Sequence, residues 1–217
     1  MSKTKNGIEM SAYEKGIDIS HWNVVTDFNK VKAAGVDFAI IKAGGSDRVF
    51  YTDRCFDNYY RLAKLAGIKV GAYYFVGKNF LSYEDGVTDA KRFCAIVHDR
   101  DFDYPLCLDI ETTDPKKKQE ATEACIGFCE YMEKQGKYVS IYASDISGFK
   151  DSLCIDYLTK YDKWVARYGK KPVYVDKYGI WQKSSTGKID GINGNVDLDV
   201  SYVDYQKLMI KKNLNRR

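Results

Sequence analysis

The chain has 217 residues, of which 45% are hydrophobic and 29% charged, and its formal net charge is +4. This size suits one large domain or two small ones, and no apolar run approaches the roughly 18 residues that a membrane-spanning helix needs. No basic block is interleaved with aromatic residues, which argues against nucleic-acid binding. The two histidines lie far apart and the six cysteines form no CxxC pair, so we expect buried thiols and no metal site.

The hydrophobic pattern predicts alternating strands and helices over most of the chain. Strands are expected at 15–20, 36–44, 68–76, 105–111 and 137–144. Helices are expected at 25–35, 53–67, 83–97 and 119–136, with a shorter one around 151–159. Three further strands, at 162–169, 178–185 and 195–202, follow with little helix between them.

This order of elements predicts the fold class. Strand–helix repetition calls for parallel strands joined by right-handed crossovers, and eight strands would close a barrel. We therefore predict an α/β fold: an irregular TIM-like barrel of five βα units followed by three β-strands with little helix. The barrel is expected at 15–205, with an N-terminal extension at 1–14 and a frayed basic tail at 206–217. A doubly wound sheet is disfavoured because the first strand–helix joint has no GxGxxG.

The stretch YPLCLDIE ends an apolar run with two carboxylates, Asp109 and Glu111. Residues two apart on a strand point to the same side, with Cα atoms roughly 6.5 Å apart. Like charges this close raise one pKa, so that one group stays protonated near neutrality. Glycoside hydrolysis uses such a pair, through a carboxylate nucleophile, an activated water or the substrate's own acetamido oxygen. The sequence leaves these three routes open.

Other polar and aromatic residues fall near the ends of the remaining predicted strands. In a parallel barrel the active site lies at the carboxyl ends of the strands. We therefore expect three more carboxylates at this rim, namely Asp18, Asp197 and Asp199. We expect a groove between them, lined by Tyr73, Tyr74, Phe75, Tyr142, Trp164, Arg167 and Trp181. His21 is interpreted as a structural or rim histidine, and Trp22 as either a sugar-stacking or a barrel-capping residue.

Several segments in order, from Lys15 to Tyr202, resemble the Chalaropsis-type lysozymes, glycoside hydrolase family 25. They include GIDISHWN, GVDFAIIKAG, YPLCLDIE, VSIYAS, KWVARY and GIWQKSSTGKIDGINGNVDLD. The resemblance implies a flattened barrel that hydrolyses the β-1,4 bond between N-acetylmuramic acid and N-acetylglucosamine in peptidoglycan, without a metal or other cofactor. The family's DxE motif matches Asp109 and Glu111, with Glu111 as the general acid.

The resemblance also assigns roles to other positions. The family's first-strand and last-strand aspartates match Asp18 and Asp197, which would tune charge and hold the site. Its groove-lining positions match Tyr73, Tyr74, Tyr142, Trp164 and Trp181. The chain departs from the family pattern at Lys183, where an aromatic is common, and at Asp199, where the motif usually reads DLN. Asp199 shares a strand face with Asp197, so it adds charge near the site and is expected to shift the pH optimum.

The expected partner is the glycan strand of peptidoglycan, with no nucleic acid, no membrane insertion and a monomeric protein. MSKTKNGIEMSAYEKG lacks the apolar stretch of a Sec signal, which predicts synthesis in the cytoplasm and action on the cell wall after phage lysis or non-Sec secretion. Two alternatives stay open. A chitinase-like enzyme usually has an Asp-Gly pair upstream of its carboxylates, and a non-catalytic wall-binding module would lack the acid at Glu111.

Overall fold

The computed structural model describes residues 2–3, 9–10 and 13–216. Most of the predicted N-terminal extension lies outside these residues. Its described parts are β1 (Ser2–Lys3) and β2 (Glu9–Met10), which pair antiparallel, and residues 13 and 14. None of the described helices is long and apolar enough to cross a membrane.

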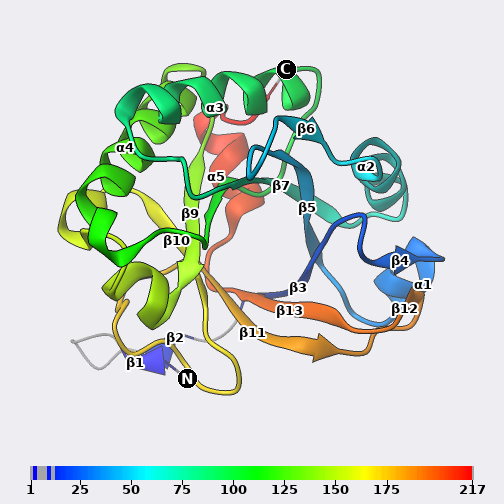
Figure 1. Cartoon of the computed structure of the whole chain (residues 1–217). Coiled ribbons are helices and arrows are strands. Elements are labelled where there is room, and N and C mark those ends of the chain that lie inside the picture. The colour runs from blue at the N-terminus through cyan, green and yellow to red at the C-terminus, as the bar shows by residue number, and fades with distance from the viewer. Residues whose placement is uncertain (1, 4–8, 11–12, 217) are drawn as a thin grey trace.

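Eight strands close into a barrel, as the sequence predicts (Figure 1). Around the ring they are β3 (Glu14–Ile19), β5 (Phe38–Gly45), β7 (Lys69–Val76), β8 (Leu106–Ile110), β9 (Val139–Ser144), β10 (Asp162–Ala166), β11 (Ile180–Gly187) and β13 (Val196–Ser201). The seven strands from β3 to β11 run parallel, and the carboxyl ends of these strands form one rim.

The last strand, β13, runs antiparallel to both of its neighbours, β11 and β3. It is therefore the beginning of this strand, and not its end, that reaches the carboxyl rim. The short connection 188–195 explains the direction, because strands joined without a crossover pair antiparallel. The register places Asp197 directly opposite Asp18, so the predicted convergence of these carboxylates holds although the strand direction was not foreseen.

Helices lie around the outside of the barrel, from the left across the top to the right in Figure 1. They are α1 (Phe28–Ala33), α2 (Phe56–Leu65), α3 (Tyr83–Val97) and α4 (Lys118–Lys134), and α3 and α4 lie side by side over the parallel strands (Figure 1). The helix expected at 151–159 is instead a π-helical turn, η2 (Asp145–Lys150), followed by a 3-10 turn, η3 (Ile155–Leu158). Short pairings add β6 (Tyr51–Thr52) to β5, and β4 (Val24–Val25) to β12 (Ile192–Asn193). A 3-10 turn, η1 (Pro115–Lys117), precedes α4.

Strand alternation divides the buried residues into two cores. One lies between the strands and the outer helices and includes Ile41, Tyr74 and Phe128. The other fills the barrel interior, where the rings of Phe38 and Tyr104 stack with centroids 4.2 Å apart. This inner core is the floor beneath the rim.

The expected basic tail is mostly a helix, α5 (Tyr205–Lys212), and it is part of the barrel. Tyr205 and Met209 are fully buried and belong to the inner core. Asn215 is also fully buried, and its side chain donates to the carbonyl of Tyr104 and accepts from the N–H of Tyr138. The prediction of a frayed tail from residue 206 was therefore wrong. The apolar residues at 205 and 209, four apart on one helix face, instead close the end of the barrel opposite the rim.

Candidate active site

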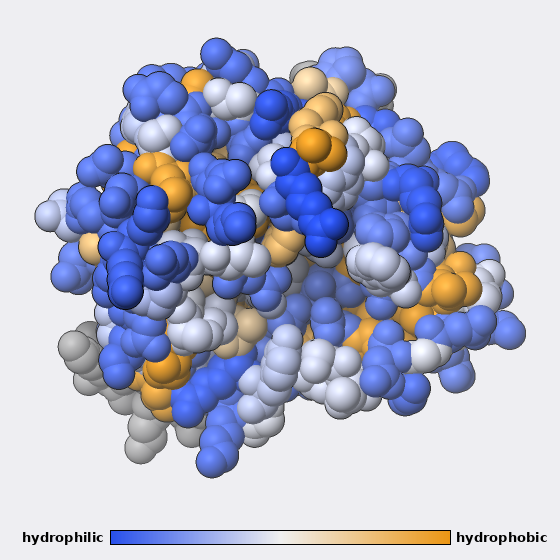
Figure 2. Space-filling model, viewed as in Figure 1, coloured by the Kyte–Doolittle hydropathy of each residue, from blue (hydrophilic) through white to orange (hydrophobic). Residues whose placement is uncertain are grey.

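A cleft with a volume of about 590 Å³ opens at the carboxyl rim. Its lining residues are His21, Trp22, Lys42, Asp47, Arg48, Tyr51, Tyr73, Phe75, Asp109 and Glu111. Figure 2 shows this face hollowed near its centre, between the segment that carries β6 and the strand β11. The cleft lies where the sequence predicts the site.

Asp109 and Glu111 leave β8 on the same side and reach the cleft floor. Asp109 is 5% exposed, and its Oδ1 receives no hydrogen bond from any described residue. Burial and the nearby charge of Glu111 raise the pKa of Asp109 well above its ordinary range. Burial also raises the pKa of Glu111, which is the more exposed of the two. The two carboxyl groups lie within hydrogen-bonding reach of each other, so the pair holds a proton more readily than free carboxylates do.

Lys42 is a site residue that sequence reasoning missed. It is 9% exposed, and its ammonium group lies over the ring of Phe75, 4.5 Å from the centroid. Its positive charge lowers the pKa of both Asp109 and Glu111, against the effect of burial. The available signal was a lone charge within the apolar run FAIIKAGG, since a lysine is rarely buried without a partner.

Asp18, Asp197 and Asp199 gather on neighbouring strands at the other side of the rim. Asp18 and Asp199 are 7% and 1% exposed. Burial raises the pKa of Asp18 well above its ordinary range and that of Asp199 to about 7. The more exposed Asp197 also has a raised pKa, chiefly through burial. These three predicted carboxylates do lie together.

Gln182 connects the two sides of the rim and was not assigned a role from sequence. Its Nε2 donates to Asp18 Oδ2 over 2.7 Å. Its Oε1 accepts from the hydroxyl of Tyr142 over 2.8 Å and from that of Tyr168 over 3.2 Å. Tyr142 is thus almost fully buried beneath the site, where it orients Gln182.

His21 and Trp22 form one wall of the cleft. The side chain of Trp22 is exposed, and its ring packs against the imidazole with centroids 4.5 Å apart. His21 Nδ1 lies 2.6 Å from Asp53 Oδ2, so a hydrogen bond to this carboxylate fixes the orientation of the imidazole ring. His21 is therefore a fixed rim histidine, and Trp22 offers a free flat face, which favours the stacking interpretation over the capping one.

Tyr73 and Phe75 line the cleft as predicted, but Tyr74 does not. Tyr74 is fully buried on the outer side of the barrel, where its hydroxyl donates to Asp89. Consecutive strand residues face opposite sides, so Tyr73 and Tyr74 were never compatible with one groove.

Three other predicted groove residues are also placed elsewhere. Trp164 is 1% exposed in the inner core, and its indole N–H donates to Asp199. Arg167 pairs with Asp145 over 2.9 Å. Trp181 is paired in register with the outward-facing Val165, and its indole N–H donates to the carbonyl of Arg167. These residues support the rim rather than line the cleft.

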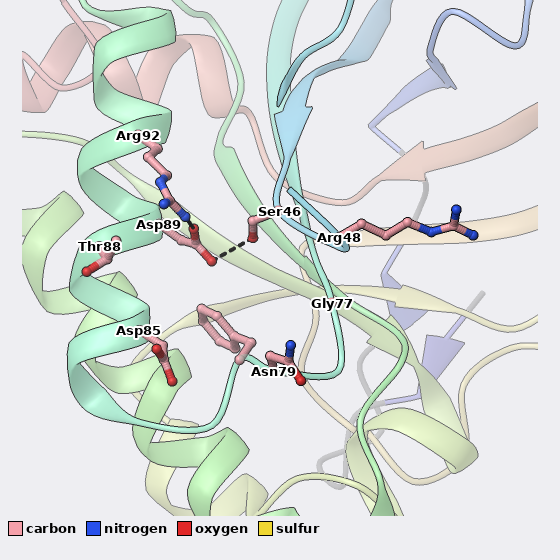
Figure 3. A pocket seen from close by; sticks show the side chains of 9 residues that line it. Ser46, Arg48, Gly77, Asn79, Asp85, Thr88, Asp89 and Arg92 are labelled. Atoms are coloured by element: carbon pink, nitrogen blue, oxygen red, sulfur yellow. Dashed lines mark hydrogen bonds and ion pairs between the residues drawn. The ribbon is translucent and has the colours of Figure 1, made fainter. Parts of the chain in front are cut away.

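A smaller pocket of about 170 Å³ lies beside the cleft, between α3 and the segments that follow β5 and β7 (Figure 3). Inside it Asp89 accepts from Ser46 over 2.7 Å and from Arg92 over 2.9 Å. The side chain of Arg48 points away from α3 in Figure 3, and Arg48 borders both this pocket and the cleft. The paired groups in the pocket anchor the segment after β5 to α3, and so fix one border of the cleft.

Fold and site together define a class of protein. A carboxyl pair at the end of the fourth parallel strand of an α/β barrel, in a cleft with aromatic walls, is the arrangement of a barrel glycoside hydrolase. The sequence profile of Glycosyl hydrolases family 25 matches residues 17–192, and the chain belongs to this family. This confirms the resemblance found in the sequence.

Individual proteins agree with this membership. The chain is 31% identical over 186 residues to the autolytic lysozyme of Clostridium acetobutylicum. The aligned region covers 85% of this chain and 55% of that protein. The chain thus spans about half the length of this relative. The crystal structure of a lysozyme from Streptomyces coelicolor superposes with a TM-score of 0.73 at 26% identity, covering 94% of this chain and 99% of that one. The CTP1L endolysin superposes with a TM-score of 0.77 at 26% identity, and the superposition covers 91% of this chain and 69% of that one.

Proposed function

We propose that the chain is a peptidoglycan muramidase, which hydrolyses the β-1,4 bond between N-acetylmuramic acid and N-acetylglucosamine. Glu111 acts as the general acid and Asp109 as its partner. The observation that carries the proposal is the neighbouring pair of Asp109 and Glu111, one buried and one exposed, lining an aromatic-walled cleft. The names of the similar proteins, an autolytic lysozyme, a lysozyme and an endolysin, support the substrate class.

The different exposure of the two carboxyl groups supports their division of roles. Glu111 is exposed to the cleft and can reach a glycosidic oxygen, whereas Asp109 is buried below it. A glycan chain in the cleft removes water from Glu111 but changes little around Asp109. Binding therefore raises the pKa of Glu111 further and moves the shared proton toward the leaving oxygen.

The other cleft residues suit a sugar substrate. The exposed indole of Trp22 and the rings of Tyr51 and Phe75 offer apolar faces against which a sugar ring packs. The ammonium group of Lys42 also lines the cleft, where its positive charge partly offsets the negative charge of Asp109 and Glu111. Asp109 serves as nucleophile, as base for a water or as orienting group for the acetamido oxygen. The anomer first released, followed by NMR, separates inversion from the two retaining routes.

The first test is digestion of purified peptidoglycan by the wild type and by Glu111→Gln. The wild type is expected to release new reducing-end N-acetylmuramic acid, and the variant to lose about 10²–10⁴-fold in rate while still binding the wall. Glu123→Gln, an exposed glutamate on α4, is the matched control and should keep full activity. Binding without new reducing ends from the wild type would leave a wall-binding module. Reducing-end N-acetylglucosamine would indicate cleavage of the other glycosidic bond.

We also propose that the protein works as a monomer and reaches the wall as a phage or prophage endolysin. The similarity to the CTP1L endolysin supports the endolysin setting. Light scattering after size-exclusion chromatography tests the first point. Expression in a Gram-positive host with and without a pore-forming holin tests the second, with lysis expected only when the pore is present.

A further inference from the structure

Asp18 and Asp199 form a buried carboxyl pair that the proposed chemistry does not use directly. Asp18 stands opposite Asp197 in the β3–β13 register, and Asp199 lies two residues further along the same face of β13. The carboxyl groups of Asp18 and Asp199 are within hydrogen-bonding reach of each other. Neither makes an ion pair with a cation among the described residues.

One oxygen of this pair has no partner. Asp199 Oδ1 accepts the indole N–H of Trp164 over 2.8 Å, but Asp199 Oδ2 is buried and no donor from a described residue reaches it. An unsatisfied buried carboxylate oxygen is costly, and two ionised carboxylates in contact would add repulsion. A proton placed between Asp18 and Asp199 removes both penalties. The buried position raises the pKa of each group in the direction that this requires.

The surroundings supply little compensating charge. From β11, Gln182 donates to Asp18, and the positive charge of Lys183 acts on Asp199 from a distance. Asp197, on β13 itself, adds a negative charge. Other titratable groups near the pair are Tyr73 on β7, Cys107 on β8, Tyr142 on β9 and Tyr168 after β10. Burial raises the pKa of each, so each is neutral at pH 7.

We infer that Asp18 and Asp199 share a single proton at neutral pH, and that Asp199 is thereby a positioning residue that sets the charge facing the general acid. With the proton bound, the pair carries one negative charge, and without it the pair carries two. Tyr73 and Tyr168 feel the charges of both Asp18 and Glu111, so the pair and the acid border the same space. The second charge would raise the pKa of Glu111 and keep it protonated at higher pH.

The indole N–H of Trp164 provides a direct probe that needs no substrate. In proton–nitrogen NMR spectra its signal, identified by its loss in Trp164→Phe, should shift with a midpoint at or above neutral pH as Asp199 ionises. Asp199→Asn should abolish that shift. Asp197→Asn is the matched control: it removes a charge but not the indole contact, so the shift should persist with its midpoint moved to lower pH. A Trp164 signal that does not titrate between pH 5 and 9, or that titrates equally in Asp199→Asn, overturns the shared proton.

The role in catalysis rests on the proposed function and has its own readout. Asp199→Asn should move the alkaline limb of the pH–rate profile to lower pH by about 0.5–1 unit, because the variant cannot gain the second charge. An unchanged limb would show that the pair does not act on Glu111. If the indole titrates as expected but the wild type cleaves no peptidoglycan, the proposed function fails and the shared proton stands.

A second variant covers the case in which Asp199→Asn does not fold. Asp18→Asn leaves Asp199 its indole bond but removes the neighbouring acid. The Trp164 signal should then titrate with a midpoint below that of the wild type, since Asp199 no longer faces a second carboxyl charge. A midpoint equal to or above that of the wild type would contradict the pairing.

Discussion

Lys42 is the side chain through which β5 controls the charge of the cleft. Its ammonium group lies over the ring of Phe75 and lowers the pKa of both Asp109 and Glu111. Replacing Lys42 by methionine keeps the length and removes the charge, so both pKa values should rise. We expect the whole pH–rate profile, measured on soluble peptidoglycan fragments, to move to higher pH by about 1 pH unit. Lys207→Met, exposed at the opposite end of the barrel, should leave the profile in place. A profile that moves downward, or equally in both variants, would contradict this role.

Single residues also show where sequence reasoning succeeds. Asp109 and Glu111 were predictable because a carboxylate pair ending an apolar strand is a local pattern. Tyr74 was misplaced because all three aromatics of one strand were assigned to the groove, against the two-residue period. Gln182 could not be singled out, since its importance comes from hydrogen bonds to Tyr142 and Asp18, which lie on other strands.

Among the elements, η2 fixes the long connection between β10 and β11 through Asp145. The side chain of Asp145 is buried, accepts the backbone N–H groups of Val173, Tyr174 and Val175, and pairs with Arg167. Asp145→Asn loses the charge and part of this acceptor capacity. We expect it to lower the free energy of unfolding by about 2–4 kcal/mol in urea titrations.

Hydrogen exchange at the amides of residues 173–175 should increase in the same variant. Asp151→Asn, an exposed aspartate just after η2, is the control and should change stability by less than about 0.5 kcal/mol. If both variants are equally stable, Asp145 does not hold this connection.

The helix α5 makes a second prediction at this scale. Met209 is fully buried in the inner core, while its neighbour Ile210 is exposed on the same helix. Met209→Ala should lower the free energy of unfolding by about 2–5 kcal/mol because it leaves a cavity, whereas Ile210→Ala should have a small effect. Thermal and urea unfolding of the two variants provide the measurement. Similar losses in both would mean that α5 does not close the barrel.

Element prediction was strongest where local signals agree. The eight barrel strands and the four outer helices follow from periodicity and glycine stops, with shifts at their ends. By contrast, the segment of α5 was predicted as part of a basic tail because Lys211, Lys212, Arg216 and Arg217 cluster at the end of the chain, and its two core residues, Tyr205 and Met209, were overlooked. The direction of β13 depends on which strands it pairs with, and that information is not local to its sequence.

For the whole molecule, the buried acids predict an unusual dependence of stability on pH. Asp199 has an ordinary pKa of 3.8 and one of about 7 when folded, and Asp18 and Asp109 are raised in the same direction. The native state therefore binds more protons than the unfolded state between these values. The contribution of these groups is fully present below about pH 4 and is lost as pH rises through the folded pKa values.

We expect the free energy of unfolding to fall between pH 5 and pH 8, by up to about 1.4 kcal/mol per pH unit for each extra proton bound. Asp199→Asn should make this fall smaller, because one of the acids is gone. Urea titrations at several pH values measure both slopes. A wild-type stability that rises over this range would show that other groups dominate the proton balance.

The antiparallel direction of β13 also decides how the protein can be tethered. Its last residue, Ser201, is paired with Glu14, the first residue of β3, so the chain enters and leaves the barrel at the same end. Asn215, beyond α5, is bonded to Tyr104 and Tyr138 at that end too. The cleft opens at the opposite end. A bead, surface or fused domain attached before β3 or after α5 would therefore hold the molecule by the end opposite the cleft. The cleft would then face outward, toward a substrate too large to diffuse to it.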